Sequence, residues 1–107
     1  MGEPALDLSE IVDLYKEDAR RMIGQMRNAL AQWSAIPPRS AAGQDLRRLS
    51  HQLRGSGRTY GFRNVTRVSK AIEEIILKVE KNKLPANDRT QEAIRKKIER
   101  LAEIFAS

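Results

Sequence analysis

The sequence predicts an all-α protein built as an antiparallel, up-down-up-down four-helix bundle. Apolar residues recur every three or four positions in four separate stretches, which is the period of an α-helix with one buried face. Short connections containing proline, glycine or asparagine join these stretches, and none of the stretches alternates like a β-strand. Because such helices cannot bury their apolar faces singly, we expect them to pack side by side, each antiparallel to the next.

The first helix is predicted over residues 8–33. Asp7 and Glu10 form a capping box at its start, which satisfies backbone N–H groups of the first turn. Gly24 lowers the helix propensity in the middle of this stretch, and it is expected to let a neighbouring helix approach closely. The methionine, tryptophan and tyrosine residues of this helix are interpreted as core residues.

The second helix is predicted to follow a proline-containing break at residues 34–40. Consecutive prolines end the first helix, and Ser40 is expected to cap the second. This helix runs to about Tyr60, with Gly61 as its C-terminal glycine cap and Phe62 folding back onto the core.

The last two helices are predicted over residues 64–81 and from Asp88 onward. Asn64 is expected to cap the third helix. Asp88 and Gln91 are expected to form the cap and its partner at the start of the fourth. Residues 82–87 are predicted to form the loop between them.

Length and composition favour one small domain spanning residues 1–107, with 40% hydrophobic and only 5% aromatic residues. The chain has no cysteine, which excludes disulfides and thiolate metal sites. One histidine and no set of carboxylates at ligand spacing predict no metal and no cofactor. No apolar run approaches the ~20 residues of a membrane span, and no signal pattern opens the chain, so a cytoplasmic location is expected.

The positive charge is concentrated in one part of the sequence. The net charge is +6, and the segment 39–70 carries eight basic residues against one acid, Asp45. The basic residues are Arg39, Arg47, Arg48, Arg54, Arg58, Arg63, Arg67 and Lys70. This asymmetry indicates an anionic ligand or partner.

His51, the single histidine of the chain, lies within this basic segment. At about 100° per residue, one stripe of the second helix is formed by Leu46, Leu49, Leu53, Gly57 and Tyr60. His51 lies on the other side of the helix, among arginines, so we expect its imidazole to face solvent rather than the core.

The neighbours of His51 suit phosphoryl chemistry. An exposed neutral imidazole is a competent nucleophile, and planar guanidinium groups pair well with phosphoryl oxygens. Gly55 lies one turn beyond His51 and removes a side chain where a large partner would approach. A glycine inside a helix otherwise costs about 1 kcal/mol, so its presence there favours a role in access.

These residues resemble the motif of the histidine-containing phosphotransfer domains of bacterial phosphorelays. The motif residues are His51, Leu53, Arg54, Gly55 and Ser56, with Gly61 ten positions after the histidine. Phe62 and Glu73 also match a pattern of the phosphotransfer domains of chemotaxis histidine kinases. Two positions depart from the family pattern, since Arg54 replaces the usual lysine and Ser50 the usual alanine.

The resemblance implies that His51 accepts a phosphoryl group at Nε2. The group is exchanged with an aspartate of a response-regulator receiver domain or received from a histidine kinase, with the direction left open. The resemblance also implies that Glu73 accepts a hydrogen bond from Nδ1 of His51 and fixes its tautomer. On this reading the chain is a monomeric phosphocarrier and not an enzyme, because the receiver supplies the metal and the acceptor.

The expected site residues around His51 are Arg54, Gly55, Ser56 and Glu73. Contacts to the phosphate or to the partner are expected from Arg47, Arg48, Arg58, Phe62 and Lys70.

Two other functions remain open from the sequence. A basic helical module that binds nucleic acid or another polyanion would use the same segment, 39–70. The second open function is that of an inhibitor: a phosphotransfer-like domain that binds a kinase or receiver without being phosphorylated. A phosphate-binding P-loop is rejected, because the Gly55–Gly57 run lacks the Gly-Lys-Ser/Thr ending and a preceding strand.

Overall fold

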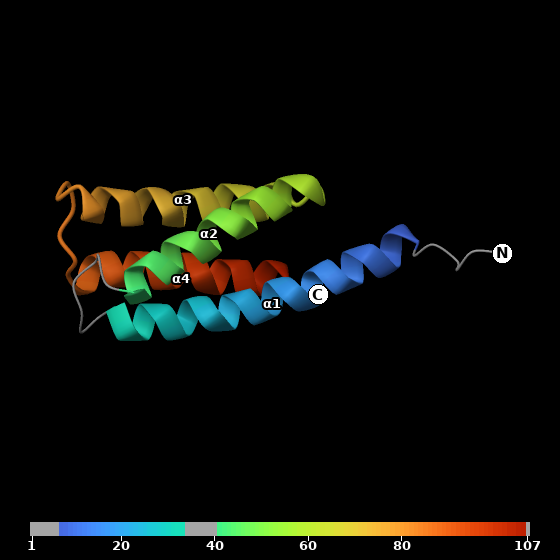
Figure 1. The fold of residues 1–107 in the computed structure, drawn as a ribbon, viewed down its shortest axis with the longest axis horizontal. Helices are drawn as coiled ribbons and strands as arrows, with labels where there is room; N and C mark the ends of the chain where they lie inside the picture. Colours follow the sequence, from blue (N-terminus) through green and yellow to red (C-terminus); the bar gives the residue numbers. More distant parts are fainter. Residues whose placement is uncertain (1–6, 34–40, 107) are drawn as a thin grey trace.

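The computed structural model describes residues 7–33 and 41–106, and these form four α-helices without a strand. The helices are α1 (Leu8–Trp33), α2 (Ala41–Thr59), α3 (Arg63–Glu80) and α4 (Asp88–Ile104). Successive helices run in opposite directions along the long axis of the molecule (Figure 1). Each helix packs against two neighbours, α1 and α3 both contacting α2 and α4. The predicted antiparallel four-helix bundle is confirmed.

Asp7 caps the start of α1, which is the first half of the predicted capping box. The Asp7 carboxylate accepts a hydrogen bond of 2.8 Å from the backbone N–H of Glu10. This bond lowers the pKa of Asp7 below its ordinary value of 3.8, because it favours the charged carboxylate. The predicted break at 34–40 and the Ser40 cap lie outside the described residues.

The α2–α3 turn closes around Gly61, whose φ of 80° is in the left-handed region. The N–H of Phe62 donates to the carbonyl of Gly57 at 2.7 Å, and the N–H of Gly61 donates to the carbonyl of Arg58 at 3.4 Å. These two bonds form a Schellman motif, which explains why the predicted glycine cap ends the helix here.

The predicted caps of α3 and α4 are wrong by one or two residues. The capping position of α3 is Phe62, without a side-chain bond, and Asn64 lies inside the first turn, because the Gly61 turn directs the chain straight into the helix. Asn87 caps α4, since its side chain accepts a bond of 3.0 Å from the N–H of Thr90. Asp88 is instead the first residue of α4, near the positive end of the helix dipole.

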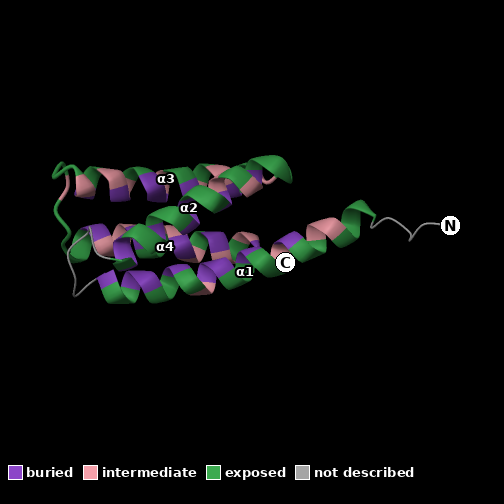
Figure 2. Ribbon diagram, viewed as in Figure 1, coloured by how far each residue is buried: buried purple, intermediate pink, exposed green. Residues whose placement is uncertain are grey.

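The core runs along the bundle axis, where the apolar stripes of the four helices meet (Figure 2). As predicted, the large side chains of α1 are buried in it, namely Tyr15, Met22, Met26 and Trp33. Among the described residues, no helix has the length and apolar content that crossing a membrane requires.

Aromatic rings close one end of the bundle, beside the α2–α3 turn. Tyr15 stacks on Tyr60 with ring centroids 4.4 Å apart, and Phe62 and Phe105 pack around Tyr15 at 5.4 and 5.7 Å. Burial raises the pKa of Tyr15 above its ordinary value of 10.0. Beyond this cluster α1 continues past the other helices (Figure 1), which leaves Leu8 75% exposed.

Two glycines of the helices differ in what surrounds them. A Cβ on Gly57 would lie 2.7 Å from Oγ1 of Thr66, so this glycine permits the close approach of α2 and α3, as its place on the core stripe indicates. A Cβ on Gly24 would meet nothing within 4 Å. The expectation that Gly24 admits a neighbouring helix is therefore wrong, because its position turns away from the helix contacts.

Candidate functional site

His51 lies on the outer side of α2, opposite the buried leucines of the same helix. Its side chain is 68% exposed, whereas Leu49 and Leu53 are 2% and 0% exposed. The imidazole borders an open depression of about 840 Å³ between α2 and α3. Its lining residues are Gln44, Asp45, Arg47, Arg48, His51, Gln52, Glu73 and Glu80. The outward orientation that helical geometry predicts is therefore what the structure has.

Glu73 of α3 reaches His51 from across the helix interface. Its Oε2 lies 3.1 Å from Nδ1 of His51, and its Oε1 accepts a bond of 3.2 Å from Nη1 of Arg54. The Glu73 side chain is only 10% exposed, so the two oxygens are held by these two partners rather than by bulk water.

This geometry selects one tautomer of the imidazole. A carboxylate bound to a guanidinium group is an acceptor, so Nδ1 of His51 carries the proton and donates a hydrogen bond to Glu73. The lone pair of the neutral ring is then on Nε2, and this ring belongs to an exposed side chain. Nε2 is therefore the nitrogen available as a nucleophile, while Nδ1 is held by its hydrogen bond to the buried Glu73 carboxylate.

The other basic residues near His51 divide into paired and unpaired groups. Arg47 forms an ion pair of 3.2 Å with Glu80, and Arg48 lies 3.6 Å from Asp45. Arg58 and Lys70 are exposed, and neither has an ion pair within the described residues. The arginine-rich face of α2 is thus interleaved with carboxylates, two of which, Glu73 and Glu80, come from α3.

Sequence reasoning missed Asp45 and Glu80 as residues of this depression. A signal for Glu80 was available, because it lies seven residues, or two helical turns, after Glu73 and so shares its face of α3.

The residues after Arg54 take different places. Gly55 is exposed, and a Cβ there would meet nothing within 4 Å, so the packing of this chain gives no reason for a glycine. Ser56 is not brought to His51, since five residues turn it about 140° around the helix. Its Oγ lies within hydrogen-bond distance of Oη of Tyr15 and of the carbonyl oxygen of Leu53, both at 3.3 Å, and its single proton is donated to one of them.

Two further residues of the motif have clear structural surroundings. Phe62 is half-buried in the aromatic cluster, with its ring 5.7 Å from that of Phe105, so most of its surface is covered by this chain. Ser50, where the family has alanine, is fully buried and donates its hydroxyl to the carbonyl of Leu46 at 2.8 Å. That internal bond explains how a hydroxyl is tolerated beside His51.

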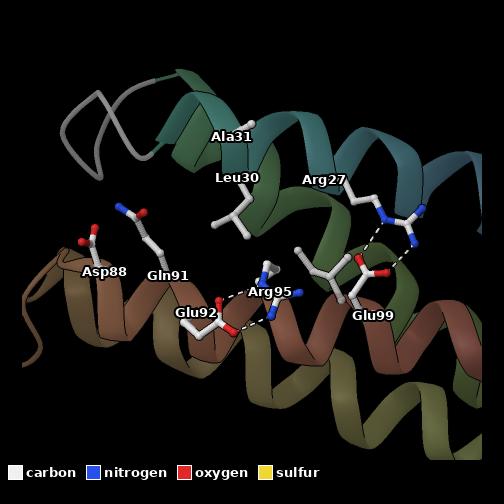
Figure 3. A pocket seen from close by; sticks show the side chains of 9 residues that line it. Arg27, Leu30, Ala31, Asp88, Gln91, Glu92, Arg95 and Glu99 are labelled. Carbon is white, nitrogen blue, oxygen red and sulfur yellow. Dashed lines mark hydrogen bonds and ion pairs between the residues drawn. The ribbon is translucent and has the colours of Figure 1, made fainter.

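A second depression, of about 510 Å³, lies between α1 and α4 and contains none of the predicted site residues (Figure 3). Arg27 crosses its edge and donates two bonds of 2.8 and 2.7 Å to Glu99. Arg95 is paired with Glu92 of the same helix. These four charged lining residues are thus held in ion pairs within this chain.

The chain thus folds as a four-helix bundle that carries an exposed, carboxylate-bound histidine on its second helix. The family model of the Hpt domain matches residues 10–104. The chain therefore belongs to the Hpt domain family, whose members have a phosphotransfer role in two-component signalling. They are phosphocarriers that interact with kinases or response regulators, rather than catalysts. No curated protein matches the chain, and no solved structure matches it.

Proposed function

We propose that His51 accepts a phosphoryl group at Nε2 and exchanges it with an aspartate of a response-regulator receiver domain. The observation that carries this proposal is the pairing of an exposed imidazole with a buried acceptor, Nδ1 lying 3.1 Å from Glu73. Family membership supports the reaction class.

The transfer balances without any proton leaving the ring. The lone pair of Nε2 attacks the phosphorus of the aspartyl phosphate, the N–P bond forms, and the acyl P–O bond breaks to release the carboxylate. The imidazole keeps its proton on Nδ1 and becomes a cation. The Glu73 carboxylate is already hydrogen-bonded to Nδ1, so it stabilises this cation without moving. The reverse transfer follows the same path, so the chain serves either direction.

Arg54 and Gly55 have supporting parts in this proposal. Arg54 is a positioning residue, since its bond to Oε1 of Glu73 holds that carboxylate beside Nδ1 of His51. Gly55 leaves open space one turn from His51, where the backbone of a docked partner can lie. Binding of the partner supplies the remaining requirement, the alignment of phosphorus with Nε2.

The experiment is transfer from a panel of receiver domains phosphorylated at their aspartates. Labelling of the chain with acid-labile, base-stable phosphate is expected, and His51→Gln is expected to abolish it. The matched control adds Gln52→His to His51→Gln, which moves the imidazole by one residue, about 100° around the helix and away from Glu73. That double variant is expected to stay unlabelled.

The outcomes separate the functions that the sequence leaves open. Labelling that survives His51→Gln refutes the assignment of the acceptor. A chain that binds a receiver tightly without becoming labelled in either direction is an inhibitor, and the proposal is then wrong.

A further inference from the structure

Most arginines of this protein are neutralised by the protein itself. Within the described residues, seven arginines form an ion pair with a carboxylate, as Arg27 does with Glu99 across the α1–α4 interface. These pairs occur along α1, α2 and α4, and three of them link different helices. These seven arginines are therefore compensated locally by a neighbouring carboxylate.

Four of the cations that have no ion pair among the described residues gather at the α2–α3 turn. Arg58 ends α2, and Arg63, Arg67 and Lys70 follow on the first two turns of α3. All four are exposed, and no ion pair to any of them exists within residues 7–33 and 41–106. We call them the turn cations.

The turn cations form one surface rather than a scatter of charges. Arg63, Arg67 and Lys70 are spaced at i, i+4 and i+7, so they project from the same face of α3. Arg58 lies on the neighbouring helix end, across the turn that Gly61 closes (Figure 1). Glu74 is the nearest acid on that face of α3, one turn beyond Lys70. Four unpaired like charges over so short a distance make a local positive field that repels itself unless a partner neutralises it.

This surface is continuous with the phosphotransfer site. Arg58 lies one turn after Gly55 and two turns after His51 on α2, about 10 Å along the helix. A protein large enough to present an aspartate to His51 also covers the turn cations, because a standard interface buries ~800 Å² on each partner. A partner bound at His51 would therefore also lie beside the turn cations.

We infer that the turn cations dock a carboxylate-rich surface of the protein that exchanges phosphoryl groups with His51. The inference rests on the proposed function and adds the kind of partner surface that the site selects. Charges at the edge of an interface steer association and reject partners of like charge more than they add affinity. The expected partners are thus receiver domains with acidic residues beside the phosphorylation site.

A protein surface fits the charge pattern better than a nucleic acid does. The depression at His51 is lined by three carboxylates, from Asp45, Glu73 and Glu80. A continuous phosphate backbone that bound the turn cations and ran along α2 would meet these acids. A protein can place its own carboxylates opposite the turn cations and other groups opposite the acids.

The test compares two triple charge reversals. The test variant carries Arg63→Glu, Arg67→Glu and Lys70→Glu. The control carries Lys83→Glu, Arg89→Glu and Lys96→Glu, which lowers the net charge equally at exposed positions of the α3–α4 loop and α4. A neutral variant carries Arg63→Gln, Arg67→Gln and Lys70→Gln, and it is expected to lower the transfer rate less than the charge reversal. Circular dichroism verifies that each variant folds.

The measured quantity is the second-order rate constant of transfer with the fastest receiver domain of the panel. At about 50 mM salt, the test variant is expected to lower it at least ~10-fold and the neutral variant less, while the control lowers it under ~2-fold. At about 500 mM salt these differences are expected to shrink, because ions screen the surface. Equal losses in test and control variants, or no loss in the test variant, overturn the inference.

The failure of the inference is distinguishable from failure of the proposed function. Anisotropy titrations of His51→Gln with the same receiver measure docking without chemistry, and the added test reversals are expected to weaken this binding. If no receiver of the panel transfers, the proposed function fails. Poly-L-glutamate and a duplex DNA oligomer are then the probes. The carboxylate-binding role of the turn cations survives, without the phosphoryl-exchanging partner, only if poly-L-glutamate binds and the test reversals abolish that binding. Tighter, reversal-sensitive binding of the DNA overturns it in favour of a nucleic-acid surface.

Discussion

Gly55 and Gly57 lie two residues apart on α2, and replacing each by alanine is predicted to change stability in opposite directions. Both substitutions raise helix propensity by about 1 kcal/mol. At Gly55 nothing lies within 4 Å of the new Cβ, so this gain is unopposed. Gly55→Ala is therefore expected to stabilise the fold by about 1 kcal/mol.

At Gly57 the new Cβ has no room. It would lie 2.7 Å from Oγ1 of Thr66, 3.0 Å from the N of Thr66 and 3.1 Å from the carbonyl oxygen of Phe62. The Thr66 hydroxyl is itself bonded to the carbonyl of Arg54 at 3.1 Å, and the other two atoms are backbone. Overpacking of this kind costs about 1–3 kcal/mol, which exceeds the propensity gain. Gly57→Ala is expected to destabilise the fold by about 1 kcal/mol.

Urea unfolding followed by circular dichroism measures both variants, with the slope m unchanged. The two unfolding free energies are expected to differ by about 2 kcal/mol, or roughly 10 °C in Tm for a domain of this size. A Gly57→Ala protein as stable as the parent, or a Gly55→Ala protein less stable, would refute the packing described for the α2–α3 interface.

The remaining predictions concern the site and one ion pair. Gly55→Trp is expected to fold normally and to slow phosphotransfer about 100-fold, because the bulky side chain displaces the docked partner by more than 1 Å; normal transfer would show that no partner approaches there. Glu73→Gln is expected to slow transfer about 10–100-fold while receiver binding stays unchanged, and ¹⁵N spectra are expected to show a mixed His51 tautomer; a pure Nδ1–H tautomer with slow transfer would argue against positioning. The bond from Arg27 holds the pKa of Glu99 below its ordinary value of 4.5, so the pair stabilises the fold above that pH and ceases to do so as the pH falls through the lowered pKa. The Arg27 and Glu99 side chains are 48% and 40% exposed, so Glu99→Gln is expected to cost only about 0.5 kcal/mol at pH 7 and less as the pH falls through the pKa of Glu99, and a loss that grows toward acid pH would contradict this.

Local sequence patterns were sufficient for the helices and for the orientation of His51. The repeat of apolar residues predicts each helix to within one or two residues, and the Gly61 cap follows from its glycine alone. The outward imidazole follows from the angle between His51 and the leucine stripe. These properties depend on the 3.6-residue period and on residues close in the chain, so they can be read without knowing how the helices pack.

The exact caps and the role of Gly24 could not be read in this way. Asn64, Asp88 and Asn87 are all residues that can cap a helix, and the geometry of the preceding turn decides which one does. No atom lies within 4 Å of a Cβ placed on Gly24, because α2 and α4 contact other faces of α1. Which faces they contact depends on the packing of the whole bundle.

The charge environment of His51 was decided by the tertiary structure. From the sequence, His51 stands in a run of arginines, and only a family likeness singles out Glu73, twenty-two residues away. Docking α3 antiparallel on α2 brings Glu73 to Nδ1 and to Arg54, and Glu80 to Arg47, while the turn cations keep no acid partner among the described residues. Helix periodicity orients a side chain about its own axis, but the distance between two charges on different helices depends on the rotation and register with which those helices pack.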